Sequence, residues 1–306
     1  MYELIWVNKI KKLMHKLIYK SQTVLFALAI LLMANTMKAE GIISTEIVGK
    51  GQPMILIHGM SCSSDVWKDV TNHFKNNYEI HLVTLKGFGN KENVESNHFL
   101  KEVRNELIDY VKEHNLKNTI LMGHSMGGFL SLWAASEAPD LFSKIISVDG
   151  IPYFPAVQMP GITPESAKNM AQQMQANMKN VSEEAFAQQQ KMIIAGMIAT
   201  PDKREQVIEM GINSNRTVIT QAYGEMYTTD IRTEMSKVKT PVLVLGAWAA
   251  YEQYGSTKQA VENNYKAQCK DIKNVKVAVA DKAYHFIFYD EPNWFYEQVD
   301  SFLTSN

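Results

Sequence analysis

The chain has 306 residues, of which 46% are hydrophobic and 10% aromatic, enough for one large domain or two smaller ones. Its formal net charge of −1 shows no basic excess, which argues against nucleic acid or anionic membrane surfaces as partners. No Cys/His cluster has the spacing of a zinc site, and no phosphate-binding or dinucleotide-binding glycine motif occurs. We therefore expect neither a metal nor a cofactor.

Residues 1–39 differ in charge and hydropathy from the rest of the chain. They contain six lysines and one glutamate, a net charge of +5, so the remainder carries −6. The lysines precede an apolar run at 23–34, which is shorter than the about 20 residues of a membrane span. This order predicts a secretory signal peptide that is cut near Ala39, with export to the periplasm or beyond and no stable membrane insertion afterwards. An uncleaved membrane anchor is the alternative.

Two cysteines, Cys62 and Cys269, are present, and an exported chain could join them in a disulfide. Cys62 comes just after a glycine loop, whereas Cys269 lies in a late helical pattern, so nothing indicates that they pair. We expect both to be free thiols.

Strands and helices alternate over most of the remaining sequence. The apolar and β-branched runs predict strands at 42–48, 53–57, 78–85, 119–122, 145–150, 240–246 and 275–280. Apolar residues at helical spacing predict helices at 97–115, 126–138, 256–269 and 292–304. This alternation is typical of an α/β protein with a mainly parallel sheet, whose ligands bind at the carboxyl ends of the strands.

The pattern changes between Ile151 and about Lys237, where helices without strands are predicted. Nine of the 17 methionines lie in this segment, and Met170, Met174 and Met178 share one helical face. We interpret 151–237 as a helical cap that is inserted into a body made of 40–150 and 238–306. The methionine face either lines a substrate pocket or packs the cap onto the body.

The stretch Gly123-His124-Ser125-Met126-Gly127 joins a predicted strand to a predicted helix. A serine on such a sharp turn needs small neighbours two residues away, and Gly123 and Gly127 provide them. The turn would expose the Ser125 hydroxyl above the sheet and direct the Met126 N–H at an oxyanion. We interpret the stretch as a nucleophile elbow, the alternative being an ordinary glycine-rich turn.

A second strand, 53–57, ends at His58-Gly59-Met60. This loop resembles that of the α/β-hydrolase superfamily, in which the N–H after the His-Gly pair is the second oxyanion donor. The resemblance therefore implies this role for the N–H of Met60. We expect His58 to stabilise the loop as a structural histidine rather than to take part in catalysis.

The elbow, the His58-Gly59 pair, the strand at 241–246 and the His285-Phe286 pair ahead of Pro292 together resemble the α/β-hydrolase superfamily. The resemblance covers residues 41–306. It implies a mostly parallel eight-stranded sheet, flanked by helices and interrupted by a cap. It also implies a serine nucleophile, Ser125, and a histidine base, His285, after the last strand.

The sequence lacks a carboxylate at the position where most relatives carry the acid that orients the histidine. Most relatives carry it shortly after the strand that follows the cap, where this chain has Ala249 and Ala250. Asp149, at the end of the strand before the cap, is the preferred candidate because some family members place their acid there. Glu252 is the alternative, and the absence of any carboxylate partner is a third possibility.

These residues predict an exported serine hydrolase that cleaves a small carboxylic ester through an acyl-enzyme. The same residues could instead cleave an amide, a peptide or a carbon–carbon bond, or transfer an acyl group. A binding protein on a hydrolase scaffold is the non-catalytic alternative. The sequence indicates a small-molecule substrate and leaves its identity and the oligomeric state open.

Overall fold

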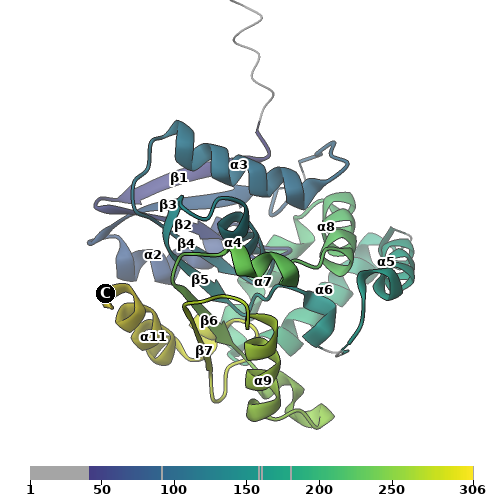
Figure 1. Ribbon diagram of the computed structural model, residues 1–306. Helices are drawn as coiled ribbons and strands as arrows, with labels where there is room; N and C mark the ends of the chain where they lie inside the picture. Colours follow the sequence, from purple (N-terminus) through teal and green to yellow (C-terminus); the bar gives the residue numbers. More distant parts are fainter. Residues whose placement is uncertain (1–40, 91, 158, 160, 180, 306) are drawn as a thin grey trace, which may run out of the picture. The chain divides into compact units, whose positions relative to one another are not determined.

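The computed structural model describes residues 41–305 except 91, 158, 160 and 180. The predicted signal peptide, 1–39, lies outside these residues. The described chain from residue 42 onward forms one compact unit built on a twisted sheet (Figure 1). Its strands are β1 (Ile43–Gly49), β2 (Gln52–Ile57), β3 (Tyr78–Leu85), β4 (Thr119–His124), β5 (Phe142–Val148), β6 (Val242–Gly246) and β7 (Val275–Val279).

The strand order is β1-β3-β2-β4-β5-β6-β7, and every neighbouring pair is parallel except β1 with β3. The chain leaves β2 towards one edge of the sheet and returns from β3 to pair β4 with the other side of β2. The carboxyl ends of β2 and β4 therefore meet where the direction of winding reverses, which is where open α/β sheets bind their ligands.

The described sheet has seven strands, one fewer than the resemblance implied. The difference has a simple origin in the sequence. The chain has seven apolar runs of strand type, and each of them forms a strand, so the described residues offer no extended segment for an eighth.

Helices cover both faces of the sheet. One face packs against α3 (Phe99–Glu113), α4 (Met126–Glu137) and α9 (Lys258–Gln268), and the other against α2 (Lys68–Phe74) and α11 (Pro292–Thr304). Each face of the sheet carries its own hydrophobic core, and alternate residues of a strand point into opposite cores. In β2, Ile55 and Ile57 belong to one core, and Met54 and Leu56 belong to the other.

Cys62 and Cys269 are buried and form no disulfide. Burial raises the pKa of each thiol to about 12.

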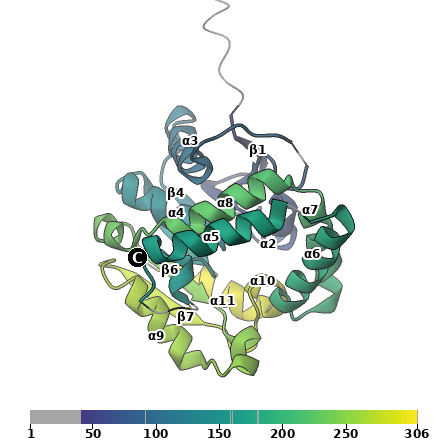
Figure 2. The same cartoon turned by 90° about the vertical axis from the view of Figure 1, so that its right-hand side faces the viewer.

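The chain between β5 and β6 is helical, without a strand among its described residues. It contains α5 (Pro164–Lys179), α6 (Glu183–Met197), α7 (Arg204–Ile212) and α8 (Arg216–Thr228), with short 3-10 turns η2 (Phe154–Val157), η3 (Pro201–Lys203) and η4 (Arg232–Lys237). Helices α5 and α8 pack along each other, as Figure 2 shows, and α6 packs against α7.

The remaining short elements are η1 (Ser64–Trp67), η5 (Ala249–Tyr254) and α10 (Ile287–Asp290). Within the described residues, no helix is both long and apolar enough to span a membrane.

Candidate active site

A tight turn between β4 and α4 places Ser125 at the carboxyl end of the sheet. Ser125 has φ 55° and ψ −116°, a conformation that costs a residue with a side chain about 1–3 kcal/mol. A Cβ on Gly123 would lie 2.0 Å from the carbonyl oxygen of Gly127, and one on Gly127 would lie 2.2 Å from that of Ile57. Only glycine at both positions lets strand and helix pass this closely.

The loop after β2 lies directly against this turn. A Cβ on Gly59 would be 3.2 Å from the Cβ of Ser125, so the absence of a side chain lets the two segments touch. Within the described chain, the N–H groups of Met60, which follows Gly59, and of Met126, at the first position of α4, make no hydrogen bond. Two free backbone donors thus lie on the two segments that meet at the serine.

His58 holds the β2 loop through both ring nitrogens. Its Nδ1–H donates to the carbonyl oxygen of Gly59 at 2.7 Å, and its Nε2 accepts the N–H of Leu85 at 3.0 Å. Burial lowers the pKa of His58 from its ordinary value of 6.5 to about 4. The neutral ring therefore connects the loop after β2 with the end of β3.

This buried histidine makes stability pH-dependent. Because the pKa of His58 is lower in the folded than in the unfolded chain, its contribution is complete above pH 6.5 and is lost as the pH falls towards 4. We expect this group to contribute about 3 kcal/mol to the loss in the free energy of unfolding, measured as the pH dependence that urea unfolding of the wild type shows and that of His58→Asn lacks. In histidine-labelled NMR spectra, assigned with His58→Asn, a His58 resonance that titrates near pH 6.5 would contradict this.

His285 lies in the loop between β7 and α10 and contacts Asp149, which follows β5. The Nδ1–H of His285 donates to Oδ2 of Asp149 at 2.5 Å, and the side chain of Asp149 is only 7% exposed. Glu252, the other candidate, lies exposed in η5, and no hydrogen bond joins it to His285 among the described residues. The carboxylate next to the histidine is thus that of Asp149.

Two further donors hold Asp149, and the sequence analysis identified neither. Its Oδ1 accepts the N–H of Ala247 at 2.8 Å and the hydroxyl of Tyr265 at 2.7 Å. Burial and the adjacent carboxylate raise the pKa of Tyr265, so its phenol stays a donor. Tyr265 lies four residues after Val261 on the buried face of α9, and this spacing predicts only a core residue. The N–H of Ala247 is a backbone group, so no residue type in the sequence indicates its role.

Replacing Tyr265 with phenylalanine removes one of these donors while keeping the ring. We expect Tyr265→Phe to lower kcat/KM for an ester substrate about tenfold, because a charge-assisted hydrogen bond that fixes the Asp149 carboxylate is lost. Tyr254→Phe is the matched control, since Tyr254 is 79% exposed, and it should leave kcat/KM unchanged. Equal rates for Tyr265→Phe and the wild type would show that Ala247 alone suffices.

His124, between Gly123 and Ser125, connects the serine turn to the His285 loop. Its Nε2–H donates to the carbonyl oxygen of His285 at 3.1 Å, while its buried Nδ1 has no partner in the described chain. Burial lowers the pKa of His124 well below its ordinary value, so the ring is neutral. His124 thereby orients the backbone that carries His285.

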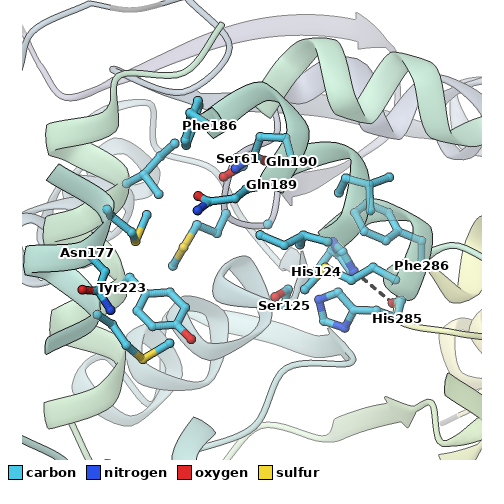
Figure 3. A pocket seen from close by; sticks show the side chains of 18 residues that line it. Ser61, His124, Ser125, Asn177, Phe186, Gln189, Gln190, Tyr223, His285 and Phe286 are labelled. Atoms are coloured by element: carbon cyan, nitrogen blue, oxygen red, sulfur yellow. Dashed lines mark hydrogen bonds between the residues drawn. The ribbon is translucent and has the colours of Figure 1, made fainter. Parts of the chain in front are cut away.

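A cavity of about 310 Å³ opens beside these groups (Figure 3). Ser125 and His285 lie at one end with residues of the β2 loop, and side chains from the helices between β5 and β6 form most of the remaining wall. Of the methionine face, Met174 and Met178 line the cavity together with Met197, whereas Met170 does not. The full lining is Gly59, Met60, Ser61, His124, Ser125, Met174, Asn177, Met178, Phe186, Gln189, Gln190, Ile193, Ile194, Met197, Ile219, Tyr223, His285 and Phe286.

Comparisons with known proteins bear on the fold and the family of the chain. A family model described as alpha/beta hydrolase fold matches residues 52–292. The chain is 24% identical over 266 residues to a pimeloyl-[acyl-carrier protein] methyl ester esterase of Vibrio cholerae, covering 85% of this chain and 97% of that protein. An enzyme of the same name from Legionella pneumophila is 25% identical over 257 residues, covering 83% and 96%. A solved esterase from Exiguobacterium antarcticum superposes with a TM-score of 0.72 at 18% identity, covering 86% and 96%.

Proposed function

Because the chain belongs to the alpha/beta hydrolase fold family and is a hydrolase, we propose that it cleaves a small carboxylic ester through an acyl-enzyme on Ser125. One observation carries the proposal. The Asp149 carboxylate, the His285 ring and the Ser125 turn lie at the carboxyl ends of the strands, and both Ser125 and His285 border the same cavity. Esterases among the related proteins support the choice of an ester bond.

The hydrogen bond between Asp149 and His285 supports the following roles. Asp149 holds the Nδ1–H of His285, which leaves Nε2 as the base that removes the Ser125 proton. The serine oxygen attacks the ester carbonyl, and the N–H groups of Met60 and Met126 stabilise the oxyanion. His285 then protonates the departing alcohol. Water, activated by the same ring, cleaves the acyl-enzyme and releases the acid.

The cavity supports a small substrate. Its volume of about 310 Å³ is near the lower end of the range for small-molecule sites, and apolar side chains dominate its wall. We assign segment 151–237 the role of a cap that closes over this site, between body segments 40–150 and 238–306. Its support is that α5, α6 and α8 contribute lining residues.

We also propose that residues 1–39 are a signal peptide and that the mature enzyme is periplasmic or secreted. The support is the sequence pattern of lysines followed by a short apolar run. Cell fractionation of the full-length chain, with N-terminal sequencing of the exported product, tests this. A cytoplasmic protein that begins at its first residue would contradict it.

The experiment for the enzymatic proposal is covalent trapping with kinetics. Purified protein should hydrolyse short-chain nitrophenyl esters, and a fluorophosphonate should inactivate it with one label per chain, mapped to Ser125 by peptide mass spectrometry. Nitrophenyl amides and acyl acceptors, offered in competition, distinguish amide cleavage and acyl transfer. Absence of both turnover and labelling would overturn the proposal and favour a binding protein.

A further inference from the structure

One polar side chain interrupts the inner face of α6. Its buried residues are Phe186, Gln190 and Ile194, at a spacing of four. An apolar residue at the middle position would continue the stripe, yet the chain has a glutamine that is only 4% exposed. A carboxamide in such a place destabilises the fold unless its oxygen and its NH2 group find partners.

The Gln190 carboxamide has no such partner in the part of the chain that the structure describes. Among the described residues, no hydrogen bond joins it to another group, although it borders the cavity that contains Ser125. A buried amide that is unpaired internally and faces a substrate cavity is positioned to bind part of the substrate.

The neighbouring helix is shaped to keep the carboxamide there. A Cβ on Gly211 of α7 would lie 2.4 Å from Oε1 of Gln190 and 3.1 Å from its Cδ, so the glycine leaves the space that the amide occupies. Its oxygen end therefore lies against α7, and the residue forms part of the cavity wall.

The polar part of the cavity wall, apart from the groups around Ser125, is uncharged. Asn177, Gln189, Gln190 and Tyr223 contribute amides and a phenol, and no Asp, Glu, Lys or Arg is among the described lining residues. Burial raises the pKa of Tyr223, which keeps the phenol neutral. In Figure 3, Asn177 and Tyr223 lie across the cavity from Ser125. A charged tail would lose its hydration here without meeting an opposite charge.

We propose that Gln190 is a specificity-determining residue. It selects esters whose acyl arm carries an uncharged hydrogen-bonding group, such as a keto, amide or hydroxyl group, beyond an apolar stretch. This inference rests on the proposed ester hydrolysis at Ser125 and names the substrate class of that site. An unsubstituted alkyl arm would leave the Gln190 amide unpaired in the complex, and a carboxylate arm would be buried without a counter-ion.

The test compares kcat/KM of the full-length protein for matched nitrophenyl esters. At each chain length, three esters are compared. The first has an unsubstituted acyl arm, the second carries a keto group at C4 to C7, and the third ends in an ω-carboxylate. We expect the wild type to prefer at least one keto ester about tenfold over its alkyl partner and to disfavour the carboxylates. In Gln190→Met, which keeps the length and flexibility of the side chain, this preference should disappear.

Two other variants complete the experiment. Gln188→Met changes the same residue type on the exposed side of α6 and should retain the wild-type preference. Gly211→Ala displaces the Gln190 carboxamide without removing it and should reduce the preference, which keeps the test valid if Gln190→Met folds poorly.

Equal rates for every keto and alkyl pair, or an undiminished preference in Gln190→Met, would overturn the inference while leaving ester hydrolysis intact. If the wild type fails to turn over any ester and resists the fluorophosphonate, the proposed function itself has failed.

Discussion

Ser125→Ala is expected to lower kcat for ester hydrolysis by about 10⁴- to 10⁶-fold, with the fold retained. The side chain that forms the acyl-enzyme is lost, and the remaining groups can only bind the ester and polarise its carbonyl. Alanine at φ 55° carries a backbone strain similar to that of serine, so the free energy of unfolding should change little. Burst and steady-state kinetics of the purified variant measure kcat, and urea unfolding followed by circular dichroism measures the free energy of unfolding.

Ser61 provides the matched control for the nucleophile. Ser61 and Ser125 are the two serines among the described residues that line the cavity. Ser61→Ala should keep the fluorophosphonate label, while Ser125→Ala should lose it. A label that persists in Ser125→Ala, or turnover within tenfold of the wild type, would refute the assignment of the nucleophile.

Asp149→Asn is expected to reduce kcat by about 10³- to 10⁴-fold for a reason that the hydrogen bonds specify. Oδ1 of Asp149 accepts from the N–H of Ala247 and from the hydroxyl of Tyr265, so an asparagine must place its carbonyl oxygen there. Its NH2 group then faces Nδ1 of His285, which has to accept. The proton moves to Nε2, and the ring can no longer remove the proton of Ser125.

The comparison with Glu252 makes this prediction selective. Glu252→Gln alters an exposed side chain in η5 and should leave kcat and KM within roughly twofold of the wild type. Steady-state kinetics of both variants from pH 6 to 9 decide between the two carboxylates. A large loss in Glu252→Gln with a small loss in Asp149→Asn would exchange their roles.

The sequence was most informative where a local pattern determines the structure. Apolar runs located the seven strands, and two glycines two residues from a serine located the turn around Ser125. The choice between Asp149 and Glu252 could not be made locally, because it depends on which strand end reaches the His285 loop in space. The eighth strand was inferred from the resemblance and has no apolar run in the described chain.

Other features of the site are invisible to sequence patterns for physical reasons. Tyr265 occupies a core position of α9, and only the packing of that helix against β6 brings its hydroxyl to Asp149. Gln190 belongs to a run of three glutamines and shares a helical face with Phe186 and Ile194, but only the fold brings that face to the cavity. The helical content of 151–237 was predictable. The sequence left open whether the methionine face lines the pocket or packs the cap, and the structure places Met174 and Met178 in the cavity wall.

The position of Asp149 has a consequence for engineering this scaffold. Ser125 and Asp149 belong to one β4-α4-β5 unit, and the N–H of Ser125 donates to the carbonyl oxygen of Val148 at 2.8 Å. Their separation is therefore fixed by sheet pairing before the chain enters the helical insertion. The segment between β5 and β6 can therefore be exchanged for one of different length or shape while the backbone pairing that places Ser125 beside Asp149 is kept. Grafting there becomes a direct way to alter substrate preference.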